Sequence, residues 1–400
     1  MIRFPLMAGI YIHIPFCKQA CHYCDFHFST SLKNKNDFLT ALLNEIGLQK
    51  DYFSLNPQNT NQSAAVRLTT YDLRLPTINS IYFGGGTPSL LSEKEINSIF
   101  YQLSKYFQIQ PGAENTLEAN PDDLTKEYLK SLRKTPVNRL SIGIQSFSDP
   151  DLRFMNRAHD SEMALNSVQA ANDAGFENLS IDLIYGTPGM NNETWINNLQ
   201  TAFALNVNHL SCYSLTVEAK TALAKMIRQR KVAEVNDQKT ADQFELLVKL
   251  SRENGFEHYE ISNFCRNEKY AVHNSNYWKG EQYLGLGPSA HSYNGTSRQW
   301  NIANNSLYIK SLLNNKLNFE KEELTISQKY NEYVLTSLRT KWGTSLNQII
   351  NTFGVEFEKH FLKETKNFSK DGFLSEKENI FYLTDKGKLF ADKIASGLFY

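Results

Sequence analysis

Short apolar runs alternate with longer amphipathic stretches over the first 215 residues of the chain. We predict strands at residues 9–14, 80–83, 115–118, 139–144, 178–184 and 209–214, and helices at residues 35–52, 93–107, 125–132, 161–174 and 193–205. Strands that alternate with helices favour right-handed crossovers and a parallel α/β sheet. Six such units fall short of the eight of a closed barrel. The pattern alone does not distinguish a partial barrel from a doubly wound sheet.

The pattern changes after residue 220, and we predict three regions: a core at 1–220, an extension and connecting region at 221–321, and a carboxyl-terminal domain at 322–400. The connecting region contains an amphipathic helix at 238–253 and a strand at 256–261. Residues 55–79 are rich in Asn, Gln and Thr and have no clear period, so we expect a surface insertion without an assigned function.

The carboxyl-terminal domain combines helical patterns with one strand pair. The helices are predicted at 327–339, 345–353 and 357–369, the strands at 373–375 and 381–383, and a last helix begins near residue 384. Three helices and a strand pair indicate a mainly helical, winged-helix-like module. Because a fold does not fix a function, we interpret it as a packing or partner-contact domain.

Three of the five cysteines fall within eight residues, as Cys17, Cys21 and Cys24. Such a C-x₃-C-x₂-C cluster in a cysteine-poor chain indicates thiolate ligation rather than a disulfide framework. Three thiolates are one short of the four that usually hold a cubane iron–sulfur cluster, so one iron would keep an open site. Two alternatives remain: a zinc site completed by His13, His22 or His27, and a redox dithiol at Cys21–Cys24.

Further candidates follow the predicted strands, where α/β barrels place their chemistry. The glycine run at 84–86, followed by Thr87, allows a ligand to approach the backbone, although such a run is often only a turn. Glu118, Gln145 and Asp182 come at or near the ends of successive strands. A buried carboxylate needs a partner, so each of these residues belongs either to a ligand site or to a structural salt bridge or turn.

The cysteine loop and its surroundings resemble the radical S-adenosylmethionine (SAM) superfamily. The segment Tyr11-Ile-His-Ile-Pro-Phe-Cys17 narrows the resemblance to the anaerobic coproporphyrinogen oxidase (HemN-like) family, which includes an oxidase and a haem chaperone. The resemblance spans nearly the whole chain and implies an open (β/α)₆ partial barrel. It also implies a [4Fe-4S] cluster on the three cysteines and SAM bound at its open iron.

The same resemblance assigns the SAM pocket residue by residue. The residues that match are Tyr11, Tyr23, Gly85, Gly86, Thr87, Glu118, Gln145, Arg157 and Asp182. The segment 273–278 (H-N-S-N-Y-W) resembles an H-N-x-x-Y-W motif that the family's chaperones associate with haem. It makes His273 the candidate haem ligand, although a loop histidine beside aromatic residues is often structural. We expect the Gly-rich loop near residue 287 to close the mouth of the barrel.

Two departures from the oxidase pattern favour the chaperone branch. Phe26 occupies the position of the oxidase's fourth cysteine, and only residues 1–7 precede the first strand, where the oxidase has a longer segment. We therefore predict a chaperone that carries haem to acceptor haemoproteins, with oxidative decarboxylation of coproporphyrinogen as the alternative.

Charge and hydropathy limit the partners and the compartment. The chain has 42 basic and 42 acidic residues, which argues against a nucleic-acid partner held by bulk charge. No run approaches the ~20 apolar residues needed to span a bilayer, and no signal peptide is recognisable. We expect a cytoplasmic protein with reduced cysteines. Peripheral membrane contact and the oligomeric state are left open by the sequence.

Overall fold

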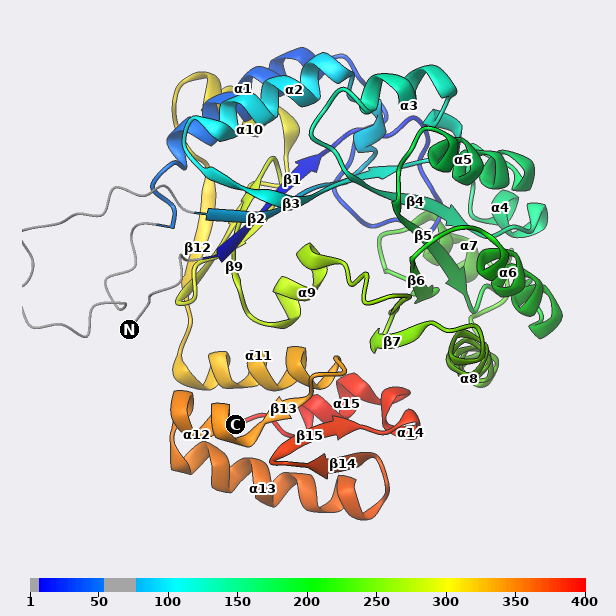
Figure 1. Cartoon of the computed structure of the whole chain (residues 1–400), viewed down its shortest axis with the longest axis vertical. Coiled ribbons are helices and arrows are strands. Elements are labelled where there is room, and N and C mark those ends of the chain that lie inside the picture. The colour runs from blue at the N-terminus through cyan, green and yellow to red at the C-terminus, as the bar shows by residue number, and fades with distance from the viewer. Residues whose placement is uncertain (1–6, 54–76) are drawn as a thin grey trace, which may run out of the picture.

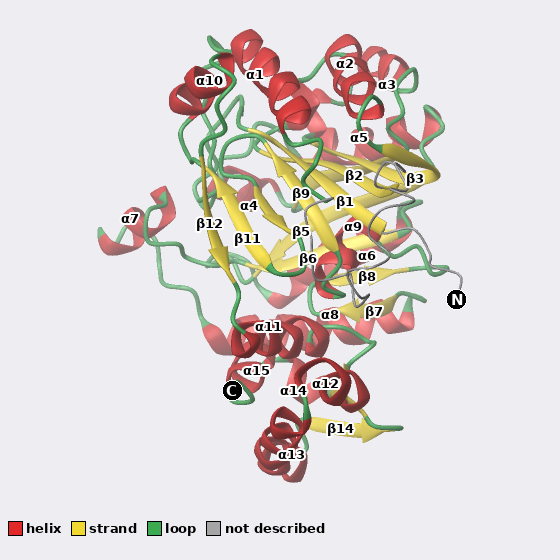
Figure 2. Cartoon of the chain, turned by 90° about the vertical axis from the view of Figure 1, so that its left-hand side faces the viewer, coloured by secondary structure: helices red, strands yellow, loops and turns green. Residues whose placement is uncertain are grey.

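The computed structural model describes residues 7–53 and 77–400 of the chain. Its framework is a 12-stranded sheet in the order β12-β11-β10-β9-β1-β2-β3-β4-β5-β6-β8-β7 (Figures 1 and 2). The six predicted strands are parallel neighbours at its centre: β1 (Met7–Ile14), β2 (Thr77–Gly85), β3 (Gln108–Ala119), β4 (Arg139–Gln145), β5 (Asn178–Tyr185) and β6 (His209–Ser214). The predicted insertion at 55–79 lies outside the described residues except for 77–79, which begin β2.

Helices cover the outer face of these strands (Figure 1). The predicted ones are α1 (Lys35–Leu48), α2 (Glu93–Ser104), α3 (Lys126–Leu132), α5 (Ser161–Asp173) and α6 (Asn192–Ala204). The helix predicted at 93–107 begins with a capping box, in which the side chains of Ser92 and Glu95 bind each other's backbone N–H groups. Two short helices, α4 (Asp149–Phe154) and α7 (Ala222–Arg228), were not predicted.

Side chains alternate in character along the parallel strands. Residues such as Ile10, Ile12 and Ile142 are fully buried in the apolar core. The alternate positions are polar, and most of them are also buried: Ser80, Glu114, Thr116, Arg139, Ser141, Ser180, His209 and Ser211. Parallel strands covered on both faces are usually apolar throughout. The alternation therefore indicates a partial barrel with a polar interior, as the resemblance implied.

The region 221–321 widens the sheet at both edges. β9 (Gln282–Leu286) is parallel to β1, and β10 (His291–Tyr293), β11 (Ser297–Asn301) and β12 (Phe319–Glu323) continue from it in antiparallel order. At the other edge, β8 (Asn263–Cys265) is antiparallel to β6 and pairs with β7 (Glu257–Glu260). Two helices also belong here, α8 (Asp237–Glu253) and α10 (Asn305–Leu313). The strand predicted at 256–261 and the helix predicted at 238–253 are both present.

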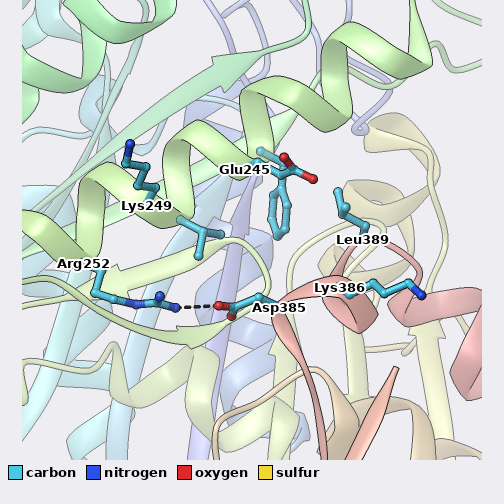
Figure 3. A pocket seen from close by; sticks show the side chains of 8 residues that line it. Glu245, Lys249, Arg252, Asp385, Lys386 and Leu389 are labelled. Carbon is cyan, nitrogen blue, oxygen red and sulfur yellow. Dashed lines mark hydrogen bonds and ion pairs between the residues drawn. The ribbon is translucent and has the colours of Figure 1, made fainter. Parts of the chain in front are cut away.

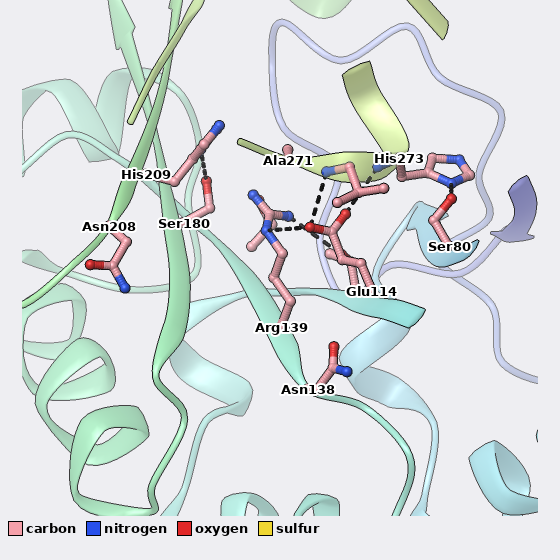
Figure 4. Close-up of polar contacts among 12 residues, drawn as sticks. Ser80, Glu114, Asn138, Arg139, Ser180, Asn208, His209, Ala271 and His273 are labelled. Carbon is pink, nitrogen blue, oxygen red and sulfur yellow. Dashed lines mark hydrogen bonds and ion pairs between the residues drawn. The ribbon is translucent and has the colours of Figure 1, made fainter. Parts of the chain in front are cut away.

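A short helix closes the end of the barrel at which the strands begin. The segment expected to be a loop forms α9 (Val272–Trp278). The carboxylate of Glu114 accepts hydrogen bonds of 3.0 Å from the backbone N–H groups of Val272 and His273 (Figure 4). The same carboxylate forms an ion pair with Arg139, with Nε and Oε2 3.8 Å apart. Glu114 thus joins a strand, a buried cation and the amino terminus of α9.

The carboxyl-terminal part is mainly helical and has its own apolar core. It consists of α11 (Ile326–Leu338), α12 (Leu346–Phe353), α13 (Val355–Lys370), α14 (Asp385–Lys388) and α15 (Ala391–Ser396) around the sheet of β13 (Thr344–Ser345), β15 (Ile380–Leu383) and β14 (Leu374–Lys377). Arg252 of α8 and Asp385 of α14 are joined by an ion pair of 2.7 Å beside a cavity of ≈ 290 Å³ (Figure 3). No helix within the described ranges is long and apolar enough to cross a membrane.

The buried carboxylate of Glu114 is expected to be a principal source of stability. The change Glu114→Gln keeps the size of the side chain but leaves the buried Arg139 without its ion-pair partner, which should lower the free energy of unfolding by about 3 kcal/mol. Glu323→Gln is the matched control, because its pair with Lys321 is exposed and should contribute less than about 1 kcal/mol. Denaturant unfolding of both variants checks the difference, and equal losses would contradict this role for Glu114.

Candidate cluster and cofactor site

A cavity of ≈ 420 Å³ lies at the carboxyl ends of the parallel strands. It brings together residues that are far apart in the sequence. Those predicted from the sequence that line it are Cys17, Cys21, Tyr23, Cys24, Gly85, Gly86, Thr87, Glu118, Gln145, Arg157 and Asp182. Of the predicted site residues, only Tyr11 and His273 are absent from its lining.

The loop that carries Cys17, Cys21 and Cys24 (the cysteine loop) is hydrogen-bonded to several neighbouring segments. The Cys17 N–H donates to the carbonyl of Ser29 at 3.0 Å, and the His22 N–H donates to the carbonyl of Met155 at 3.1 Å. Asn156, with a left-handed φ of 57°, donates through Nδ2 to the carbonyl of Ala20 at 2.7 Å. Tyr23 packs on a small apolar cluster between α4 and α7. The loop therefore holds its thiols over the cavity through backbone contacts.

The three thiols share the cavity with the side chain of Arg157. Burial raises the pKa of Cys24 to about 11 and also raises that of Cys17, so the thiolates need a nearby positive charge. Arg157 supplies one, with Nη1 3.3 Å from the Cys21 sulfur. Within residues 7–53 and 77–400, no three or more His, Cys, Asp or Glu side chains converge on a point where they could hold one metal ion.

The candidate histidines for a zinc site form hydrogen bonds with other parts of the protein. His13 uses both ring nitrogens, one with the Tyr11 hydroxyl at 3.2 Å and one with the carbonyl of His27 at 2.8 Å. His22 donates through Nδ1 to the carbonyl of Phe154, and His27 donates through Nε2 to Oδ1 of Asn305. A tetrahedral Cys₃His site needs a free imidazole nitrogen directed at the thiols. His13 has no free nitrogen, whereas His22 and His27 each keep one, so these contacts exclude only His13 as the fourth ligand.

The glycine run serves close packing within the protein as well as the cavity. A Cβ at Gly86 would lie 2.5 Å from the carbonyl oxygen of Phe16, and one at Gly85 would lie 2.5 Å from the His13 ring. The Gly86 N–H donates to the carbonyl of Ile14 at 2.8 Å. The glycines therefore let the end of β2 touch the base of the cysteine loop, a reason the sequence alone did not provide.

Two carboxylates face the cavity from β3 and β5, the strands on either side of β4. Glu118 accepts a hydrogen bond of 2.7 Å from the Tyr82 hydroxyl, and Asp182 accepts one of 3.2 Å from Ser141. Burial raises the pKa of Glu118 to about 7 and that of Asp182 to about 6. Carboxylates in this state favour a cationic ligand, because a positive charge would compensate the cost of their desolvation.

Arg157 and Gln145 complete the wall of the cavity. Arg157 Nη2 donates to Asn120 Oδ1 at 2.7 Å and to the Gly143 carbonyl at 2.8 Å, while its buried Nε has no hydrogen-bond partner within the described chain. Gln145 has a left-handed φ of 67°, which turns the chain at the end of β4. An unpartnered buried N–H is a group that a bound ligand can satisfy.

His273 lies away from the cavity, in the polar interior. Its exposed fraction is 2%, and burial lowers the pKa of its imidazole to about 3. Nδ1 forms a hydrogen bond of 2.9 Å with Ser80 Oγ, and Nε2 forms one of 2.9 Å with the Tyr277 hydroxyl. Neither nitrogen is free, so in this conformation His273 joins α9 to β2 and presents no ligand atom. Asn274, the next residue, lines the cavity instead.

Tyr11 lines a second hollow of ≈ 390 Å³ on the other side of the cysteine loop. This side groove is lined by Tyr11, His13, Asp25, Phe26, His27, Tyr277, Tyr283, Ser289 and His291. Asp25 and Phe26 line both the cavity and the side groove. The Gly-rich loop near residue 287 borders the side groove rather than the mouth of the main cavity.

Several cavity residues escaped sequence analysis. Tyr82, Asn120, Arg139, Ser141, Ser211 and Asn274 all line the cavity. Tyr82, Arg139, Ser141 and Ser211 occupy the alternate, polar positions of their strands, so a period of two could have identified them. Asn274 depends on the placement of α9 and gave no such signal.

Comparisons with known proteins agree with this geometry. The radical SAM superfamily model matches residues 11–202, and the HemN C-terminal domain model matches residues 324–390. Heme chaperone HemW of Bacillus subtilis is 31% identical over 391 residues, which cover 97% of this chain and 98% of that protein. Heme chaperone HemW of Mycobacterium tuberculosis (strain H37Rv) is 32% identical over 391 residues, with 98% and 94% covered. The chain belongs to the HemW family.

A solved structure supports the fold of this HemW-family chain. Coproporphyrinogen III oxidase (HemN) of Escherichia coli superposes with a TM-score of 0.81 over 98% of this chain and 90% of that one, at 24% identity. Identity at this level supports the architecture and leaves the reaction open. The resemblance inferred from the cysteine loop and the predicted partial barrel with a helical carboxyl-terminal region are thus confirmed.

Proposed function

We propose that this chain holds a [4Fe-4S] cluster on Cys17, Cys21 and Cys24, binds SAM beside it, and carries haem to acceptor haemoproteins. The observation that carries the proposal is the cavity itself, in which the three thiols meet polar groups from the ends of successive strands. Membership of the HemW family supports haem as the cargo, because the curated relatives are called heme chaperones.

The residues of the cavity have distinct roles in this proposal. Glu118 and Asp182 bind the cationic and hydroxyl groups of SAM, and the free Nε of Arg157 binds an anionic or carbonyl group. Gly85 and Gly86 at the end of β2 have no side chains, so the space between the cysteine loop and the strand end stays free of them. When bound, the cluster would supply the electron for reductive cleavage of SAM.

The alternative function is oxidative decarboxylation of coproporphyrinogen, which the shared fold with HemN favours. Phe26 offers a hydrocarbon ring where the oxidase pattern has a cysteine. Product analysis separates the two functions. Formation of protoporphyrinogen from coproporphyrinogen by the reduced, cluster-loaded protein with SAM would establish the oxidase and overturn the chaperone proposal.

Transfer of haem to an acceptor protein tests the proposed chaperone function. Haem-loaded protein should pass haem to an apo-form of a b-type haemoprotein, observed as the growth of the acceptor's Soret band at the expense of the donor's. The control is haem in the same buffer without the protein. Absence of saturable haem binding, or transfer no different from that control, would contradict a chaperone role.

Cluster assembly should depend on Cys21 and be independent of the buried cysteines. Cys21→Ala should abolish the [4Fe-4S] complement, because two thiolates leave two irons without protein ligands. Cys212→Ala is the matched control, since Cys212 lies in the apolar core of β6 and should retain the cluster. Iron and sulfide analysis after anaerobic reconstitution checks both, and a full complement in Cys21→Ala would refute the ligand assignment.

SAM affinity should increase with pH between 5.5 and 8. The pKa values of Glu118 and Asp182 are raised to about 7 and about 6 by burial, so both are mostly neutral at the acidic end and become anionic partners for a cation at the basic end. We expect a gain of about tenfold, since one pKa unit corresponds to a factor of ten. Calorimetry of the cluster-loaded protein checks this, with Asp182→Asn expected to weaken binding at pH 8. A flat or falling profile would exclude these carboxylates as the cation's partners.

A further inference from the structure

The side groove has the character of a site for a flat aromatic ligand. Tyr277 and Tyr283 stand edge to face, with ring centroids 4.4 Å apart and an interplanar angle of 82°. Phe26 is 67% exposed on the cysteine loop at the boundary with the main cavity. An exposed phenylalanine in a groove gains free energy when an apolar face covers it.

His291 provides a free nitrogen ligand in this groove. It begins β10, is exposed, and none of its ring nitrogens forms a hydrogen bond within the described chain. Its imidazole stacks on Trp300 of β11, with ring centroids 6.0 Å apart and an interplanar angle of 27°. The stacking orients the ring without occupying its nitrogens, as an axial ligand requires.

The other imidazoles near the groove are less free. Both nitrogens of His13 and both of His273 are hydrogen-bonded. His27 donates through Nε2 to Asn305, which leaves Nδ1, the nitrogen nearer its own backbone. The H-N-x-x-Y-W segment nevertheless reaches the groove, through Tyr277 rather than His273.

We propose that haem binds in the side groove, with its iron on an imidazole nitrogen of His291 and its porphyrin against Phe26, Tyr277 and Tyr283. The proposal rests on the haem-carrying function and specifies its site. It assigns to His273 a positioning role, in which its hydrogen bond to Tyr277 holds that ring at the wall of the groove.

Haem titration of the cluster-loaded protein tests the assignment. The variants are His291→Ala, His27→Ala and His273→Gln, each compared with the wild type by the Soret band and by the spin state of the iron in electron paramagnetic resonance. We expect His291→Ala to weaken haem binding by about tenfold or more and to remove the imidazole-ligated signal. Added imidazole should restore that signal, because it can enter the space left by the ring. His273→Gln and His27→Ala should keep the wild-type signal.

The outcomes separate this site from the function on which it rests. Wild-type protein that fails to bind haem overturns the haem-carrying function. Wild-type binding with an unchanged signal in His291→Ala, or loss of the signal only in His27→Ala or His273→Gln, overturns the side-groove assignment of His291 and leaves the function standing. His291 is exposed, so its substitution should not affect folding, and retained cluster content verifies this.

Discussion

The ion pair and hydrogen bonds of the Glu114 carboxylate hold the polar interior of the barrel together. A polar interior is costly unless each group finds a partner, and Glu114 supplies partners to three at once: the Arg139 guanidinium and the first two N–H groups of α9. Arg139 in turn lies among the polar residues of neighbouring strands, with Nη1 3.4 Å from Thr116 Oγ1. α9 therefore packs at the end of the barrel where the strands begin, and the main cavity lies at the carboxyl ends of the strands.

The two ends of the barrel differ in whether their polar side chains are already paired with one another. At the closed end, His209 is held between Ser180 and the hydroxyl of Tyr259, and His273 between Ser80 and Tyr277. At the open end, Glu118, Asp182 and Arg157 line the main cavity together with the three cysteines, and Arg157 Nε has no hydrogen-bond partner within the described chain. Polar side chains are therefore bound to one another at one end of the barrel and face a cavity at the other.

The sequence predicted the parallel core well because its signals are local. Periods of two and of 3.6 residues, capping residues such as Ser92, and the spacing of Cys17, Cys21 and Cys24 are all set by near neighbours in the chain. The four edge strands from β9 to β12 and the helix α9 were harder to predict, because they are short. In addition, β9 pairs with β1 and the amino terminus of α9 binds Glu114, and both of these partners lie over a hundred residues away in the sequence. His273 illustrates this limit. Its motif was recognised in the sequence, but the orientation of its side chain depends on a hydrogen bond to Ser80, which the motif does not reveal.

Asp25 and Phe26 connect the two hollows of the protein. Both residues line the main cavity and the side groove, and they directly follow Cys24, the last of the three clustered cysteines. A ligand in one hollow would therefore touch the same short segment as a ligand in the other. Any displacement of that segment by one ligand would change the wall that the other ligand meets.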